Sequence, residues 1–305
     1  MPSYDVMIIG GGGTGLTAAI YTSRAKLSTL LLEKLTPGGQ IALTDVVENY
    51  PGFPEGITGP EISQRMEDQA KRYGTEVKYQ EVKSIAKKNG VFEVQAAEET
   101  FQAKSLILAA GASFRMLGVP GEKELTGKGV SYCATCDGAF FKEKEIIVVG
   151  GGDSAMQEGL FLTRFASKVT VVHRRDKLRA SPILQERAKN NPKIQFMWDT
   201  VIKKIDGTKK VEGVSLENVK TQKAEDCRVD GVFVFIGHDP NTSFLKGVVE
   251  LDDKGYVKAD NSLKTSVPGI FAAGEIRAGA VKQLVSACGE GCEAALAAQD
   301  FLEHS

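Results

Sequence analysis

The sequence has little of what several classes of protein require. Its 305 residues include only five cysteines, three histidines and one tryptophan, and they carry a formal net charge of −1. That balance gives no basic footprint for nucleic acid and no polybasic anchor for a membrane. No apolar run is long enough to span a bilayer, and the first one, residues 6–9, is too short for a signal peptide. We therefore expect a cytoplasmic protein with no nucleic-acid or membrane partner.

The cysteine count also limits the chemistry. Five thiols cannot all pair within one chain, and a reducing compartment argues against a structural disulfide framework. The spacing of the cysteines therefore points to redox or metal chemistry. The hydrophobic fraction of 42% and the charged fraction of 25% are those of an ordinary globular protein, and the length suits two domains.

Glycine, in contrast, is abundant and clustered, with 33 residues in the chain. The strand-like residues 5–9 lead into the glycine-rich residues 10–15, and residues 145–149 lead in the same way into residues 150–155. A helical run follows each cluster. A second apolar strand follows each helix, at residues 29–32 and 168–172. This is the βαβ pattern that binds dinucleotides, and it occurs twice.

The order of the remaining segments indicates a nested arrangement. Residues 105–109 and 269–273 look like strands that end in glycine turns, whereas residues 231–236 look like a strand of the second unit. We predict an α/β fold of two Rossmann-like dinucleotide-binding domains, with the second inserted in the first. The first domain would comprise residues 1–112 and 242–305, and the second residues 113–241.

The two glycine turns predict different nucleotides. In the first, Gly10 permits a tight turn, Gly12 lets a pyrophosphate approach the backbone and Gly15 lets helix and strand pack closely. Glu33 ends the second strand, where a carboxylate accepts hydrogen bonds from a ribose 2′-hydroxyl and repels a 2′-phosphate. The first site therefore favours an adenosine ribose without an extra phosphate.

The second turn ends in Ala155, a known variant, and its second strand runs into several cations instead of an acid. These cations are His173, Arg174, Arg175, Lys177 and Arg179. Guanidinium groups bind a 2′-phosphate through paired hydrogen bonds, so this site favours NADP. The alternative is a solvated basic helix start without a ligand.

Cys133 and Cys136 form a CxxC pair that is followed directly by Asp137. Such pairs commonly lower the pKa of one thiol, and a thiolate is the species that attacks a disulfide. Asp137 can protonate the departing thiolate, or it can cap the helix after the motif. The alternative, structural zinc, would need four ligands, and no convincing second pair exists among Cys227, Cys288 and Cys292. We predict a redox dithiol and no metal site.

Taken together, these motifs resemble one family, the low-molecular-weight, bacterial-type thioredoxin reductases. The resemblance covers essentially the whole chain and keeps the order of the motifs. The matching segments are residues 10–15, 37–40, 47–52, 133–137, 150–155, 173–179, 237–242 and 268–274, then Gln283 and a C-terminal helix. It implies a homodimeric enzyme that transfers a hydride from NADPH to FAD. Two electrons would then pass through Cys133 and Cys136 to the disulfide of thioredoxin or a thioredoxin-like protein.

The resemblance also implies which residues contact each cofactor. It puts Gln40 and Asn49 near the flavin, with the thiol of Cys136 facing it. The set for FAD is Gly10, Gly12, Gly13, Thr14, Gly15, Glu33, Lys34, Gly39, Gln40, Asn49, Gly111, Gly274, Glu275, Ile276, Lys282, Gln283 and Leu284. The set for NADPH is Gly150, Gly152, Asp153, Ser154, Ala155, His173, Arg174, Arg175, Arg179 and Gly237.

Three residues depart from the family's pattern. Glu275 stands where the family usually has an Asp that bonds the ribityl chain, so this contact is expected to be direct, rotated or bridged by water. Ala110 stands where Thr is frequent, and Lys282 where Arg is common. The thiols and the nicotinamide would share one small domain and must reach the same flavin in turn, so we expect a hinge near residues 113 and 242.

Four other functions compete with this interpretation. A related enzyme would reduce the disulfide of another protein or of a small molecule. An electron-transfer reductase for a ferredoxin-like protein would not need Cys133 and Cys136. A ferredoxin-driven reductase would have no use for Arg174, Arg175 and Arg179, and a non-enzymatic interaction module would need neither two nucleotide sites nor the thiol pair.

Overall fold

The computed structural model describes residues 1–43 and 47–304, and the chain forms two compact units. Unit 1 comprises Met1–Ser113 and Asp239–Ser305, and unit 2 comprises Phe114–His238. The chain therefore leaves unit 1 once and returns to it. The two crossing segments, β7 (Ala112–Phe114) and β16 (His238–Pro240), pair as a two-stranded ladder.

Unit 1 is built on a seven-stranded sheet with the order β3-β2-β1-β6-β5-β4, in which β17 also pairs with β6. The central strands run parallel, and residues 6–9 and 30–32 are buried, as expected for strands that are covered on both faces. An antiparallel hairpin, β4–β5, continues the sheet. The strands are β1 (Ser3–Ile9), β2 (Thr29–Glu33), β3 (Glu76–Tyr79), β4 (Val82–Lys88), β5 (Val91–Ala96), β6 (Thr100–Leu108) and β17 (Ile270–Ala272).

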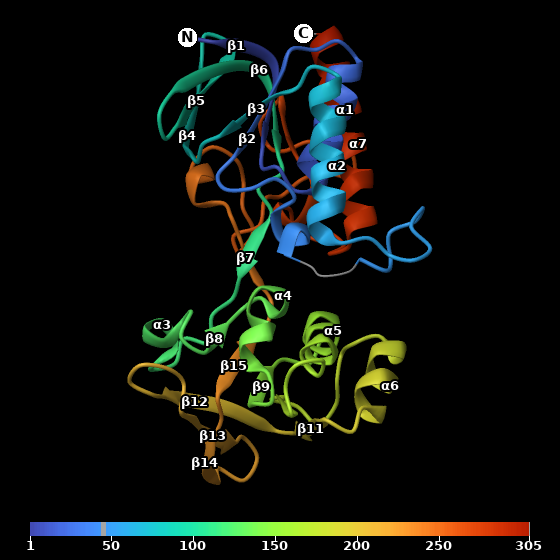
Figure 1. The fold of residues 1–305 in the computed structure, drawn as a ribbon. Coiled ribbons are helices and arrows are strands. Elements are labelled where there is room, and N and C mark those ends of the chain that lie inside the picture. Colours follow the sequence, from blue (N-terminus) through green and yellow to red (C-terminus); the bar gives the residue numbers. More distant parts are fainter. Residues whose placement is uncertain (44–46, 305) are drawn as a thin grey trace. The chain divides into compact units, whose positions relative to one another are not determined.

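Three helices of unit 1 lie side by side against this sheet (Figure 1), namely α1 (Gly13–Arg24), α2 (Gly59–Arg72) and α7 (Leu284–Glu303). Small buried residues let α1 and α7 approach closely. A Cβ on Gly291 of α7 would lie 2.2 Å from Thr14 O of α1, so a larger residue would force the two helices apart. Short 3₁₀ turns complete the unit: η1 (Gly39–Leu43), η3 (Ser243–Leu245) and η4 (Gly274–Ile276).

Unit 2 contains a five-stranded parallel sheet with the order β11-β10-β9-β15-β8, and a three-stranded antiparallel sheet, β12-β13-β14. Its strands are β8 (Val130–Ser131), β9 (Glu145–Val149), β10 (Lys168–Val172), β11 (Ile194–Met197), β12 (Thr200–Asp206), β13 (Gly213–Asn218), β14 (Ala224–Arg228) and β15 (Gly231–Val234). Its helices are α3 (Glu122–Leu125), α4 (Ala134–Asp137), η2 (Gly138–Phe141), α5 (Asp153–Leu162) and α6 (Pro182–Asn190).

Each unit thus repeats the order strand, glycine turn, helix and parallel strand, which confirms the predicted α/β class with two Rossmann-like domains. β9 and β10 have the predicted bounds. β6 begins at Thr100 rather than near residue 105, because its first half pairs antiparallel with β5. No helix in the described ranges is long and apolar enough to cross a membrane.

Candidate functional site

The first glycine turn joins β1 to α1. Gly10 has a φ of +109°, and a Cβ there would lie 2.3 Å from Ala109 O. A Cβ on Gly15 would lie 1.8 Å from Gly10 O, so this position accepts only glycine. At Gly12, the N-cap of α1, the nearest atom to a Cβ would be Gly38 O at 4.0 Å. The outer glycines therefore make the tight turn possible, and the middle one leaves room for a ligand at the helix N-terminus.

The second glycine turn, between β9 and α5, has the same construction. A Cβ on Gly150, whose φ is +149°, would lie 2.3 Å from Phe235 O. Gly152, the N-cap of α5, has no atom within 4 Å of the position that a Cβ would take. Ala155 replaces the third glycine and is fully buried. Both turns thus combine a closed first glycine with an open middle one.

Glu33 lies at the end of β2, where its carboxylate is held against the first turn. Its Oε2 accepts a hydrogen bond of 2.7 Å from Gly11 N, and its Oε1 accepts one of 3.0 Å from Leu35 N. A carboxylate has about four acceptor positions, so Glu33 keeps capacity for ribose hydroxyls. Lys34 beside it is exposed.

Other predicted residues of unit 1 gather around the same turn. Gly38 N donates to Gly11 O at 2.6 Å, which joins the segment that carries Gly39 and Gln40 to the turn. The Gln40 amide donates to Ala112 O at 2.7 Å, next to Gly111, which has a φ of +61°. Leu284, at the start of α7, packs against Gly13, because a Cβ on Gly13 would lie 2.4 Å from Leu284 Cδ1.

The turn at η4 brings Glu275 into this group. Gly274, with a φ of +73°, packs on Thr14, since a Cβ there would lie 2.3 Å from Thr14 Oγ1. Glu275 follows, and its Oε2 is buried with no hydrogen-bond partner among the described residues. Burial raises the pKa of Glu275, and the charge of Lys282 opposes that rise. A buried oxygen without a hydrogen-bond partner destabilises the folded chain. We therefore expect this carboxyl to form a hydrogen bond with a bound ligand.

Two residues that support this turn were not predicted. Glu290 of α7 accepts hydrogen bonds from Gly274 N at 2.7 Å and from Arg277 Nε at 2.7 Å, through Oε2. Its Oε1 accepts a third, from Arg277 Nη2 at 2.6 Å. This half-buried, bidentate pair fixes both ends of η4 to α7. No sequence pattern marks this pair, because glutamate on an amphipathic helix is ordinarily a solvent-exposed residue.

In unit 2 the basic loop, residues 173–179 after β10, is hydrogen-bonded to the second glycine turn. His173 is buried against Gly151, and Arg179 N donates to Gly151 O at 2.7 Å. Asp153, the first residue of α5, accepts a hydrogen bond of 2.5 Å from Ser181 N. The side chains of Arg174, Arg175 and Arg179 are exposed. The loop backbone is therefore fixed while its guanidinium groups stay free to meet a ligand.

His173 itself is a packed residue. Burial lowers its pKa, a hydrogen bond to Lys177 O opposes this, and the charges of Arg179, Arg175 and Arg174 lower the pKa further. The imidazole therefore supports the turn as a neutral ring. Gly237, the remaining predicted residue of this set, has a φ of +118° and open space where a Cβ would stand.

The CxxC motif begins two residues after the end of β8 and runs into α4. Cys133 is half-buried and disulfide-bonded, and Asp137 N donates to Cys133 O at 3.3 Å. The side chains of Thr135 and Cys136 lie outside what the structure describes, and so does the predicted contact of Cys136. Asp137 is half-buried at the N-cap of η2, where its side chain makes no capping hydrogen bond. The expected helix-capping role of Asp137 is therefore wrong, because the chain turns directly into a 3₁₀ helix.

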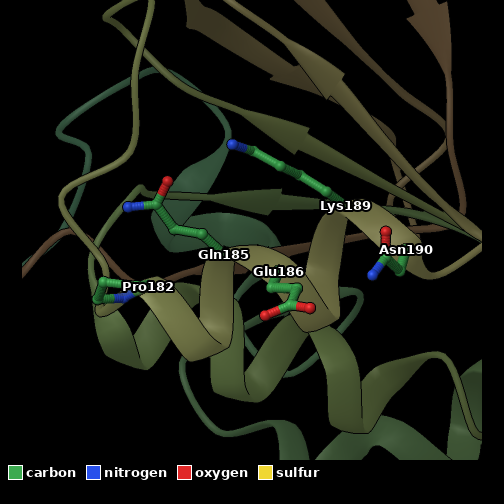
Figure 2. A pocket seen from close by; sticks show the side chains of 5 residues that line it. All are labelled: Pro182, Gln185, Glu186, Lys189 and Asn190. Carbon is green, nitrogen blue, oxygen red and sulfur yellow. The ribbon is translucent and has the colours of Figure 1, made fainter.

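In the part of the chain that the structure describes, neither a metal-ligand cluster nor the hollow along α6 adds a site to those described above. Within the described residues, no group of three histidine, cysteine or acidic side chains could hold a metal ion. A hollow of about 440 Å³ runs along α6 (Figure 2), and its lining contains none of the predicted residues. It is lined by Pro182, Gln185, Glu186, Lys189 and Asn190.

Comparison with known proteins identifies the arrangement. Residues 4–291 match the family model described as pyridine nucleotide-disulphide oxidoreductase. The chain is 50% identical over 301 residues to the thioredoxin reductase of Bacillus subtilis (strain 168), which covers 98% of this chain and 95% of that relative. The chain belongs to the thioredoxin reductases of the pyridine nucleotide-disulphide oxidoreductase family.

Two more relatives of this family span the same length. The thioredoxin reductase of Mycolicibacterium smegmatis is 50% identical over 300 residues, covering 98% of this chain and 96% of that relative. A crystal structure of the Lactococcus lactis thioredoxin reductase is 44% identical, with a TM-score of 0.97 over 99% of this chain and all of that one. The predicted family is thus confirmed. The name of the family implies that its members use a pyridine nucleotide.

Proposed function

We propose that this chain is an NADPH-dependent reductase of thioredoxin or of a thioredoxin-like protein. Its closely similar, full-length relatives carry that activity in their names. The family accounts for the two nucleotide turns and for the CxxC motif at once. The electron-transfer reductase, the ferredoxin-driven reductase and the interaction module each leave at least one of these three features without a role.

FAD is proposed to bind in unit 1. The fit rests on the open space at Gly12, the carboxylate of Glu33 beside the turn and the unpartnered oxygen of Glu275. Amides at the N-terminus of α1 would bind the diphosphate, and Glu33 would accept hydrogen bonds from the ribose. When bound, the flavin supplies the hydride acceptor and two-electron donor that links NADPH to a disulfide.

NADPH is proposed to bind in unit 2. The open position at Gly152 leaves room for its diphosphate, as at Gly12. Arg174, Arg175 and Arg179 are exposed on a fixed loop at the end of β10, where a 2′-phosphate would lie. Three positive charges there select NADPH over NADH.

The dithiol of Cys133 and Cys136 is proposed to carry electrons to the partner protein. A thiolate of the reduced pair attacks the partner's disulfide, forming a mixed disulfide and releasing one partner thiolate. The second thiolate then attacks the mixed disulfide, which releases the other partner thiol and restores the disulfide in this chain. Asp137, free of a capping role, is placed by sequence to supply the proton to a departing thiolate.

The observation that carries the proposal is the disulfide at Cys133, which directly precedes α4 in the unit that also holds the second nucleotide turn. Replacing Cys136 by Ser tests it. The variant should lose thioredoxin reduction completely, while NADPH still bleaches the flavin absorbance. Cys227→Ser, which alters a free cysteine of the same unit, is the control and should keep full turnover. Thioredoxin turnover that persists in Cys136→Ser would contradict the proposal.

Two features of the assembly belong to the same proposal. Nicotinamide and dithiol share unit 2, so the two crossing segments near residues 113 and 242 would act as a hinge that presents them to the flavin in turn. Small-angle scattering tests this, since a profile that NADPH leaves unchanged under anaerobic conditions would contradict a hinge.

The homodimer is proposed to form through α1 and α7. Val285 and Leu296 of α7, and Tyr21 of α1, are exposed large apolar side chains on helices that pack against each other. Sedimentation of the purified chain should give twice the mass of 32.8 kDa, and a species of single mass alone would contradict the dimer. The cytoplasmic location stays a prediction.

A further inference from the structure

A buried carboxylate lies close to the redox motif without belonging to it. Glu122, at the start of α3, is 1% exposed. Its Oε1 accepts hydrogen bonds of 2.7 Å from Leu117 N and from the Tyr132 hydroxyl, and its Oε2 accepts one of 2.7 Å from Gly118 N. Removing one of the three donors would destabilise the fold, because the buried charge of the carboxylate would then have fewer hydrogen bonds.

Tyr132 directly precedes Cys133 and is held on two sides. Its hydroxyl donates to Glu122, and its ring stacks on Phe114 with centroids 6.2 Å apart. Burial and the neighbouring Glu122 carboxylate raise the pKa of Tyr132, so the phenol keeps its proton and remains a donor. The residue next to the disulfide is therefore anchored by a directional hydrogen bond to the Glu122 carboxylate.

Ser131, two positions before Cys133, also holds the backbone of Cys133 in place. Ser131, which is 3% exposed, accepts a hydrogen bond of 3.1 Å from Cys133 N through its Oγ. The same hydroxyl donates to Cys133 O at 3.1 Å. The segment from Ser131 to Cys133 is thus held in the conformation that it has while Cys133 is disulfide-bonded.

We propose that Glu122 and Tyr132 are positioning residues that stabilise the disulfide form of the redox pair by holding the segment before Cys133 in place. The proposal rests on the redox role of Cys133 given above. Reduction breaks the S–S bond, takes up two electrons and two protons, and leaves two thiols that must move apart to van der Waals distance. A clamped segment resists that movement, so it shifts the equilibrium toward the disulfide and makes the dithiol a stronger reductant.

Tyr132→Phe isolates the clamp, because it removes the hydroxyl and keeps the ring on Phe114. The flavin-loaded protein is equilibrated without oxygen in graded ratios of reduced and oxidised dithiothreitol, which supply or accept the two electrons and two protons. Acid quenching, alkylation and mass spectrometry of the peptide that contains Cys133 then give the fraction reduced. We expect the variant's equilibrium constant to move about tenfold toward the dithiol, equal to about 30 mV.

Tyr4→Phe is the matched control, since the Tyr4 hydroxyl donates to Glu76 Oε2 at the same distance of 2.7 Å in unit 1. It should leave the equilibrium constant unchanged. Glu122→Gln is a second test, because its amide NH₂ would face hydrogen-bond donors, and it should shift the constant in the same direction as Tyr132→Phe.

Three results would overturn the proposal. The first is an equilibrium constant that, in both Tyr132→Phe and Glu122→Gln, stays within about twofold of its value in the unaltered protein. Since the expected change is roughly tenfold, the clamp would then have no effect on the redox pair. If Tyr4→Phe shifts the constant as much as Tyr132→Phe, the effect is a general loss of stability. If Cys133 of the unaltered protein stays in one state across all ratios, the proposed function itself fails, and this outcome is distinct from the first two.

Discussion

The side-chain amide of Asn49 donates a 2.8 Å hydrogen bond to Oε1 of Gln283, across 234 positions of the sequence. Gln283 is the N-cap of α7, so the bond joins the loop before α2 to the start of the last helix. Both residues were expected to lie near the flavin. The N-terminus of α7, together with the neighbouring Lys282, is a positive region in unit 1.

The Arg277–Glu290 pair should control how firmly that region is held. Glu290→Gln keeps an acceptor for Gly274 N but removes the bidentate ion pair, so η4 should loosen. We expect the free energy of unfolding to fall by about 2 kcal/mol and the Kd for FAD to rise. Chemical unfolding and fluorescence titration of flavin-free protein with FAD measure these effects.

Glu293→Gln is the control for that experiment, because it alters an exposed glutamate of the same helix. It should change neither quantity measurably. Equal stability and equal FAD affinity in Glu290→Gln and Glu293→Gln would mean that the pair does not hold the turn.

Glu275 should give the flavin-free protein a specific pH dependence. Burial raises its folded pKa above the ordinary value of 4.5, so its ionisation opposes folding. The associated stability is fully present below that ordinary value and is lost as the pH rises through the raised folded pKa. Glu275→Gln should remove this loss, giving a flatter profile of unfolding free energy against pH.

Glu275 should also matter to flavin retention. Glu275→Ala should release FAD more readily while the preference for NADPH over NADH stays the same, since the proposed nicotinamide site lies in unit 2. An unfolding profile as steep in Glu275→Gln as in the parent, together with unchanged FAD release in Glu275→Ala, would remove Glu275 from the site.

The basic loop should decide between the two nicotinamide nucleotides. Replacing Arg174 and Arg175 by Ala should weaken NADPH binding by about 2–4 kcal/mol, because charge-assisted hydrogen bonds to the 2′-phosphate are lost. NADH binding should change little. Lys209→Ala, an exposed cation elsewhere in unit 2, is the control for lost charge. An equal loss for both nucleotides would show that the arginines do not recognise the 2′-phosphate.

The sequence predicted the parts of the fold that depend on local patterns. Both glycine turns, the bounds of β9 and β10 and the inserted second unit follow from apolar runs and glycine spacing. The hairpin β4–β5 was not predicted, although Asn89 and Gly90 between two alternating segments are a local hairpin signal. The pairing of β1 with β6, in contrast, joins distant parts of the chain and is not a property of any short segment.

The supporting residues of the site could not be predicted for the same reason. Nothing in the sequence around Glu122 or Glu290 marks either residue as a support, and only the folded chain shows that each accepts three hydrogen bonds. Glu275, in contrast, was marked by its departure from the family's aspartate, and the structure gives that departure a physical form, a buried oxygen without a partner.

The most direct test of the electron path is an anaerobic titration of the purified, FAD-loaded protein, followed by flavin absorbance. NADPH should bleach the flavin, and oxidised thioredoxin added afterwards should restore its absorbance with one disulfide reduced for each pair of electrons. A protein that takes up no flavin, or a bleached flavin that thioredoxin leaves unchanged, would contradict the path from NADPH through FAD and Cys133 to the partner.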